Sequence, residues 1–146
     1  MSLGLYLHIP YCFSKCRYCD FYSHPGERGV PEAYVDALLR ELSRFAPEAP
    51  LQPDTLYFGG GTPSLLRPEQ AKRLIDAARP MPGAEITLEA NPETVTEESL
   101  AGFREAGVNR ISFGVQSARD IQLRTLGRTH TARQAASMPT CLRGKW

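Results

Sequence analysis

The 146-residue chain lacks a net charge of either sign and has no long apolar run. Its 17 Lys and Arg residues face 16 Asp and Glu residues, which leaves a formal charge of +1 at pH 7. Without a single-sign field, non-specific binding to nucleic acid or to an anionic membrane is not expected. No segment approaches the roughly 20 apolar residues that cross a bilayer, and no secretory signal pattern opens the chain. We therefore predict a cytoplasmic globular domain.

Cysteine is also scarce, and its placement is uneven. Cys12, Cys16 and Cys19 fall within eight residues, whereas Cys141 lies far along the chain. A disulfide scaffold spreads its cysteines over a small secreted chain, so this distribution argues against one. Crowded thiols in a reducing compartment indicate a metal or cluster site instead.

Strand and helix patterns alternate along the sequence. Short apolar segments predict strands at residues 3–9, 55–58, 85–90 and 108–115. Apolar periodicity predicts helices that begin at Pro31, at Pro68 and after a capping box at Thr94–Glu97, and a short one at 121–126. This repetition implies right-handed crossovers and a parallel sheet whose strands follow chain order. We expect an α/β fold with about four βα units, a partial parallel barrel, because a closed eight-unit barrel takes roughly 250 residues.

The three crowded cysteines form a C-x₃-C-x₂-C run directly after the first strand. Three thiolates at this spacing can hold three corners of an iron–sulfur cube and leave the fourth iron open, whereas four thiolates saturate a ferredoxin cluster. Zinc is the alternative, since His8 or His24 could complete a set of four ligands. His8 falls within the predicted strand, so we expect it to order the strand end or the loop rather than to bind metal.

Glycine-rich and polar residues follow the other predicted strands. Gly59–Thr62 ends the second strand, Glu89 the third and Gln116 the fourth, and Arg128 follows the last helix. Ligands of parallel α/β sheets bind at the carboxyl ends of the strands, and glycines let the backbone approach them closely. The glycine run lacks the spacing of a nucleotide phosphate loop. Each residue alone is an ordinary turn or surface residue, but together with the cysteines they predict one shared site.

These motifs, taken in order, resemble the radical S-adenosylmethionine (radical SAM) enzymes of the oxygen-independent coproporphyrinogen III oxidase family. The resemblance covers about residues 3–130 and rests on six motifs: LYLHIPYC through CDF at 5–21, FGGGTPS at 58–64, EANP at 89–92, GVNRIS at 107–112, GVQS at 114–117 and LGRTH at 126–130. The oxidases carry a further cysteine two residues after the third cluster ligand, where this chain has Phe21. In this respect the chain is similar to the haem-chaperone (HemW-type) branch, whose members bind haem for insertion into target proteins.

The resemblance implies a [4Fe–4S] cluster held by Cys12, Cys16 and Cys19, with S-adenosylmethionine on its open iron. The residues that it implies as contacts of S-adenosylmethionine are Tyr6, Gly60, Gly61, Thr62, Glu89, Gln116 and Arg128. One electron from the cluster would cleave the sulfonium to methionine and a 5′-deoxyadenosyl radical. Haem or porphyrin and a haem-accepting protein are the implied partners. Whether the chain is an enzyme stays open, because a true coproporphyrinogen III dehydrogenase and a non-functional truncated fragment are alternatives.

Two regions differ in how well they match the family. Residues 1–130 correspond to the N-terminal part of a radical SAM core domain, and residues 131–146 form a divergent tail, as after a truncation. Because the tail shows no clean apolar periodicity, we expect low order after about Thr131. We also expect an exposed edge at the fourth strand, where a complete barrel continues with another strand.

Overall fold

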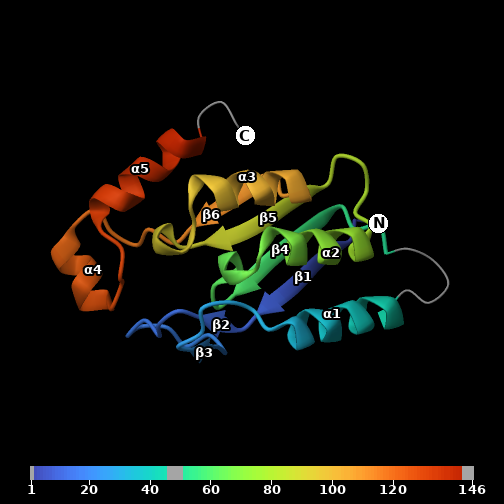
Figure 1. The fold of residues 1–146 in the computed structure, drawn as a ribbon, viewed down its shortest axis with the longest axis horizontal. Coiled ribbons are helices and arrows are strands. Elements are labelled where there is room, and N and C mark those ends of the chain that lie inside the picture. The colour runs from blue at the N-terminus through green and yellow to red at the C-terminus, as the bar shows by residue number, and fades with distance from the viewer. Residues whose placement is uncertain (1, 46–50, 143–146) are drawn as a thin grey trace.

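A computed structural model describes the backbone of residues 2–45 and 51–142, and the side chains as far as Met138. Its main sheet is parallel, with strand order β1, β4, β5, β6, and Figure 1 shows the four strands side by side. Their bounds are Gly4–Ile9, Thr55–Gly60, Glu85–Ala90 and Arg110–Phe113. The predicted parallel sheet and its order along the chain are confirmed. The last strand is shorter than the predicted segment 108–115, since the chain turns away after Phe113.

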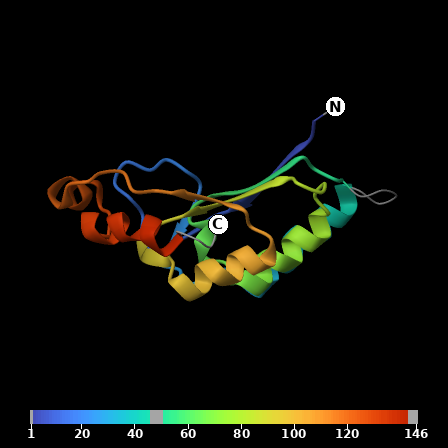
Figure 2. The same cartoon turned by 90° about the horizontal axis from the view of Figure 1, so that it is seen from above.

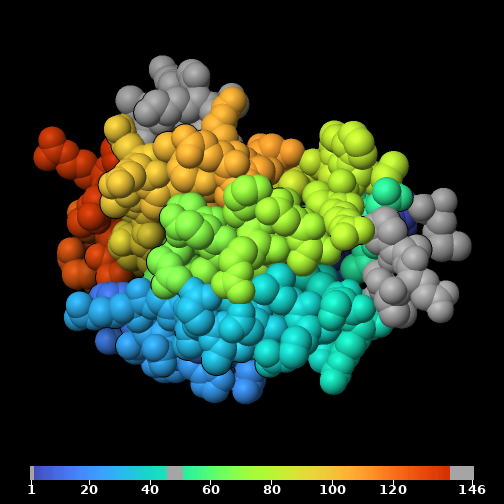
Figure 3. All heavy atoms as spheres, turned by 45° about the vertical axis from the view of Figure 1, so that its right-hand side comes forward, coloured from blue at the N-terminus to red at the C-terminus, as the bar shows by residue number. Residues whose placement is uncertain are grey.

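Three helices cover one face of this sheet. They are α1 (Glu32–Phe45), α2 (Pro68–Ala78) and α3 (Glu97–Ala106), and they lie side by side in Figures 1 and 3. The opposite face carries no helix among the described residues (Figure 2). No helix in the described ranges is long and apolar enough to span a membrane.

Shorter elements gather where the strands of the sheet end (Figure 1). A two-stranded parallel pair, β2 (Tyr11–Cys12) and β3 (His24–Pro25), frames the cysteine loop. Two 3₁₀ turns, Pro63–Leu65 and Pro92–Thr94, follow β4 and β5. The helices α4 (Asp120–Leu126) and α5 (Ala132–Leu142) complete this end.

The core lies between the sheet and the three helices. Alternate strand residues point to the helices and are fully buried, among them Ile9, Leu56, Phe58 and Leu88. Because side chains alternate along a strand, the residues between them face the uncovered side. There the register places Tyr6, Tyr57, Thr87 and Arg110 in one row across the sheet. This two-sided pattern leaves the second face polar and aromatic.

The start of α3 differs from the expected capping box. Its N-cap is Thr96, whose side chain accepts the N–H of Ser99 at 3.1 Å, while the Ser99 hydroxyl accepts the N–H of Thr96 at 2.9 Å. Thr94 is already used in the preceding 3₁₀ turn, where its hydroxyl donates to the Asn91 carbonyl at 2.9 Å. Gly107 ends α3 with φ of 112°, as predicted.

The expectation of low order after Thr131 was wrong for residues 132–142, which form α5. Capping fixes its start, because the Gln134 side chain accepts the N–H of Thr131 at 2.8 Å and the Thr131 hydroxyl accepts the N–H of Gln134 at 3.2 Å. Met138 packs on a small apolar cluster of Ala90, Val95 and Leu100. The predicted open edge is present, because β6 pairs only with β5 among the described strands.

Candidate functional site

A pocket of about 280 Å³ opens at the carboxyl ends of the strands. Its wall contains every predicted site residue except Tyr6: Cys12, Cys16, Cys19, Gly60, Gly61, Thr62, Glu89, Gln116 and Arg128. Each lies at or just after the carboxyl end of a strand, except Arg128, which follows a helix. The parallel topology therefore brings together residues that lie far apart in the sequence.

The cysteine segment forms a wide loop that leaves β2 and returns to β3. Cys12 is buried at the end of β2, and Cys16 and Cys19 are half-buried in the loop. The N–H of Cys19 donates to the Cys16 carbonyl at 3.2 Å, which closes a tight turn between these two residues. The N–H of Arg17 donates to the Leu126 carbonyl at 3.1 Å, which ties the loop to the end of α4.

All three thiols of this loop are free. Within the described part of the chain, no three His, Cys, Asp or Glu side chains are grouped to hold one metal ion. A single ion needs its ligands around one centre, whereas the thiolates of a cubane each bind a different iron. The convergence of the three sulfurs on one cluster stays a prediction. Cys141, which we expect to take no part, lies outside the described side chains.

The glycine run lets the cysteine segment pass close to β4. The N–H of Gly61 donates to the Ile9 carbonyl at 2.8 Å. A Cβ on Gly61 would lie 2.7 Å from the Tyr11 carbonyl oxygen and 2.9 Å from Cys12 Sγ. Gly60 has φ of 115°, and a Cβ there would lie 2.7 Å from the His8 ring. Only glycine fits these two positions without a shift of the backbone, so the run has a packing role as well.

Glu89 is fixed at the wall of the pocket by two donors. The Tyr57 hydroxyl donates to Oε1 at 2.7 Å and the Gly60 N–H to Oε2 at 3.3 Å. The hydrogen bond to this carboxylate, together with burial, raises the pKa of Tyr57 to about 12. The sequence did not single out Tyr57, although its place two residues before Gly59 puts it on the same strand face as the site.

Tyr6 lies behind this wall rather than in it. Its ring stacks on that of Tyr57, with centroids 6.0 Å apart and an interplanar angle of 18°. Its hydroxyl is 3.1 Å from Nδ1 of His8, and Nε2 of His8 is 3.0 Å from the Tyr22 carbonyl. His8 thus holds the cysteine loop to the strand end, as predicted. Direct contact between Tyr6 and a cofactor stays a prediction.

Arg128 crosses the pocket wall and contacts three other segments. Nη2 donates to Asn91 Oδ1 and to the Gly114 carbonyl, both at 2.6 Å, and Nη1 lies 3.3 Å from Cys16 Sγ. Burial opposes the charge, but the hydrogen bond to Cys16 and the charge of Glu93 leave the pKa of Arg128 raised. Its Nε is buried and has no hydrogen-bond partner in the described part of the chain. A fixed cation with a spare N–H suits an anionic ligand group.

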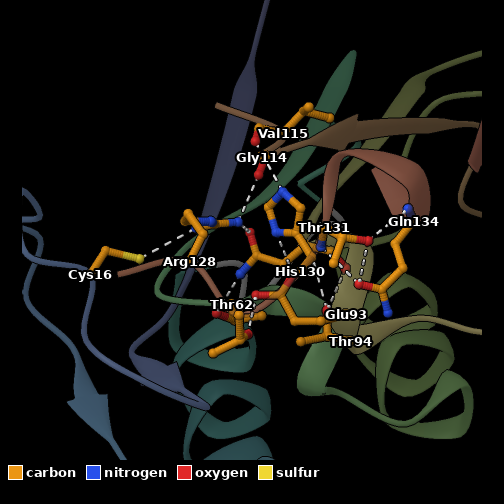
Figure 4. A network of polar contacts seen from close by, with 12 residues as sticks. Cys16, Thr62, Glu93, Thr94, Gly114, Val115, Arg128, His130, Thr131 and Gln134 are labelled. Atoms are coloured by element: carbon orange, nitrogen blue, oxygen red, sulfur yellow. Dashed lines mark hydrogen bonds and ion pairs between the residues drawn. The ribbon is translucent and has the colours of Figure 1, made fainter. Parts of the chain in front are cut away.

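His130 and Glu93 extend this network on the side away from the cysteines (Figure 4). His130 is buried, with Nδ1 3.0 Å from Glu93 Oε2 and Nε2 3.0 Å from the Val115 carbonyl. Asn91 also reaches Thr62, through Nδ2 and Oγ1 at 3.3 Å. The motifs EANP and LGRTH contain or adjoin these residues, but the sequence alone assigned no role to Asn91, Glu93 or His130.

Comparison with known proteins agrees with this site. The profile of the radical SAM superfamily matches residues 6–138, nearly the whole chain. The chain belongs to the radical SAM superfamily. Members of this superfamily in general use S-adenosylmethionine together with a [4Fe–4S] cluster, so the family resemblance expected from the motifs is confirmed.

Individual relatives place the chain more closely. It is 45% identical over 139 residues to the heme chaperone HemW of Escherichia coli (strain K12). This alignment covers 91% of this chain and 37% of that protein. It is 42% identical over 140 residues to the mitochondrial radical S-adenosyl methionine domain-containing protein 1 of Bos taurus, covering 90% of this chain and 31% of that protein. The chain therefore spans only about a third of the length of these relatives.

A solved radical SAM enzyme has the same architecture. The structure of coproporphyrinogen III oxidase (HemN) from Escherichia coli matches with a TM-score of 0.86 and 30% sequence identity. The match covers 97% of this chain and 34% of the HemN chain. This confirms the α/β fold and is consistent with part of a TIM-like radical SAM barrel.

Proposed function

We propose that this chain forms the cofactor-binding part of a haem-chaperone-type radical SAM protein. The observation that carries the proposal is that one pocket wall joins the three loop cysteines to Glu89, Gln116 and Arg128. Cys12, Cys16 and Cys19 would hold the [4Fe–4S] cluster there. S-adenosylmethionine would bind in the adjoining part of the same pocket.

The residues present fit these two groups. Three free thiols in one loop match a cluster that keeps one iron open. Gly60 and Gly61 bring only backbone atoms to the pocket wall, and the buried, unpartnered Nε–H of Arg128 offers a place for an anion. When bound, the reduced cluster supplies one electron to the sulfonium of S-adenosylmethionine.

Glu89 and Arg128, two of the charged residues of the wall, would bind the two charged groups of the methionyl part. The Glu89 carboxylate, fixed by Tyr57 and Gly60, would take the amino group of the methionyl part. Arg128, fixed by Asn91 and Gly114, would take its carboxylate through the unpartnered N–H. Charge-assisted hydrogen bonds of this kind are short and strong, so they orient a small zwitterion with few contacts. Gly60, Gly61 and Thr62 would approach the ligand from the floor.

Haem or porphyrin is the proposed partner of the whole protein. One of the relatives above is named a heme chaperone, and the chain has Phe21 where the oxidases carry a further cysteine. The competing function is coproporphyrinogen III oxidation, which the structural likeness to HemN supports. Phe21 weighs against it, because it removes a thiol next to the cluster loop.

Anaerobic reconstitution with iron and sulfide tests the cluster assignment. We expect Cys12→Ala, Cys16→Ala and Cys19→Ala each to lose the cluster absorption and most of the bound iron. The matched control is Cys141→Ala, which should load like the native chain. Equal loading of all four variants, or loss of the cluster only in Cys141→Ala, would reject the assignment.

Two further assays separate the candidate functions. Cleavage of S-adenosylmethionine by the reduced, reconstituted chain would show a competent cofactor site. Haem titration followed by the Soret absorption, with and without coproporphyrinogen as a competitor, separates the two partner classes. Haem binding without conversion of coproporphyrinogen supports the chaperone function, and conversion supports the oxidase.

A further inference from the structure

The segment after β6 makes a strained turn at the residue that it presents to the pocket. The N–H of Ser117 donates to the Val115 carbonyl at 2.9 Å, so the turn closes around Gln116 alone. Gln116 has φ of 67°, a positive value that side-chain-bearing residues seldom adopt. Three-residue turns of this positive-φ kind are rare, and such strain persists only where the surroundings enforce it.

A buried histidine enforces this turn. The Val115 carbonyl accepts a second bond from Nε2 of His130 at 3.0 Å (Figure 4). On the other side of the ring, Nδ1 lies 3.0 Å from Oε2 of Glu93, and the side chain of His130 is 0% exposed. The second oxygen of Glu93 accepts the hydroxyl of Thr129 at 3.1 Å. The ring therefore links the turn after β6 to the turn after β5.

The chemistry of the two partners explains why a histidine stands here. A carbonyl oxygen can only accept, and an ionised carboxylate can only accept as well. Both bonds of His130 therefore form only when each ring nitrogen carries a proton, or when a proton is shared with Glu93. The amide of an Asn or Gln side chain at this position could reach the Val115 carbonyl or the Glu93 carboxylate, but it is too short to contact both. With either arrangement of the proton, the ring joins the two turns through both of its nitrogens.

We propose that Glu93 and His130 form a positioning clamp that holds the strained turn and thereby keeps Gln116 in the pocket wall. The clamp deepens the proposed function and rests on it, since Gln116 acts there as a contact of S-adenosylmethionine. Gly114 directly precedes this turn, and its carbonyl accepts from Arg128. The clamp thus acts on the pocket wall at two residues without touching the ligand itself.

Two substitutions separate the two bonds of the ring. The amide of His130→Gln lies near the position of Nε2 and can still donate to the Val115 carbonyl. The amide of His130→Asn lies near the position of Nδ1, so it keeps Glu93 and loses Val115. In the cofactor-free chain we expect amide exchange of Ser117 to become about tenfold faster in His130→Asn and to stay near native in His130→Gln. Thr129→Val, which leaves both ring bonds in place, is the matched control.

Binding of S-adenosylmethionine to the reconstituted chain gives the second readout. By equilibrium dialysis, His130→Asn should bind it about tenfold more weakly, and His130→Gln within about threefold of native. Should His130→Asn fail to fold, Glu93→Ala, which leaves Nδ1 without this partner, replaces it and should speed exchange of the same amide. Equal exchange in all variants, or equal acceleration in the Asn and Gln variants, overturns the clamp. A native chain that takes up neither cluster nor S-adenosylmethionine refutes the proposed function, while the exchange data still decide on the clamp.

Discussion

Replacing Gly61 with alanine places a methyl group where the cysteine segment passes β4. The new carbon would lie 2.7 Å from the Tyr11 carbonyl oxygen, 2.9 Å from Cys12 Sγ and 3.0 Å from the Tyr11 carbonyl carbon. Backbone atoms cannot rotate away as the end of a flexible side chain can, so the segment that carries Cys12 must shift. Overpacking of this kind costs about 1–3 kcal/mol. In a chain of this size that lowers the thermal midpoint by roughly 3–10 °C.

The effect on cluster loading is the sharper measurement. Because the methyl group displaces Cys12 itself, we expect Gly61→Ala to bind less iron and sulfide than the native chain, even well below its thermal midpoint. Gly29→Ala is the matched control, since a Cβ there meets only the Leu65 carbonyl oxygen at 3.9 Å. The control should keep native stability and loading. A Gly61→Ala chain with native midpoint and native iron content would refute the packing role of this glycine.

Three further outcomes follow from the electrostatics. In a spectrophotometric titration, Tyr57→Phe should lose the tyrosine that ionises near pH 12. Because folding raises the pKa of Tyr57 from 10.0, its bond to Glu89 stabilises the folded chain fully below pH 10.0. This stabilisation is lost as pH rises through about 12. Arg128→Lys cannot reach all three acceptors of the guanidinium, and dialysis should show about tenfold weaker S-adenosylmethionine binding; equal affinity contradicts this. The Gln70 hydrogen bond and two arginines lower the pKa of Glu32 from 4.5. Stabilisation by Glu32 is therefore lost as pH falls through that lowered value, and Glu32→Gln should show a flatter acid dependence of its thermal midpoint.

The order of the sheet was predictable because each strand is short, apolar and bounded by glycine or proline. Strand β5 was predicted at its observed bounds, Glu85–Ala90, because both ends are marked by polar or turn-forming residues. The end of β6 was not, since Phe113 to Val115 reads as one apolar run. Side chains from a later part of the chain hold it there, since Arg128 donates to the Gly114 carbonyl and His130 to the Val115 carbonyl. The helix α5 was missed for a related reason: its start depends on a local cap and its burial on contacts with the turn after β5.

Most of the candidate site was predictable from its position after the strands. Sequence placed Glu89 and Arg128 at one edge because parallel strands end together. It did not reveal the partners that fix them, the donor Tyr57 for Glu89 and the acceptor Asn91 for Arg128, because hydrogen bonds between neighbouring strands and turns depend on register. Tyr6 was expected in the site, but its ring stacks on Tyr57 and does not line the pocket. Strand alternation predicts the face on which a residue lies but not whether its side chain reaches the pocket.

The ties between the cysteine loop and the end of α4 set an order of events during synthesis of the chain. The loop is made first, but the Leu126 carbonyl that accepts from Arg17 and the Arg128 group beside Cys16 emerge more than a hundred residues later. Contacts between such distant residues form late, because the entropy of closing the loop between them must be overcome first. Until then the pocket lacks the part of its wall that Arg128 forms beside the cysteine loop. The wall of the pocket is therefore complete only after α4 has left the ribosome, and we expect a cluster to load after that point rather than before it.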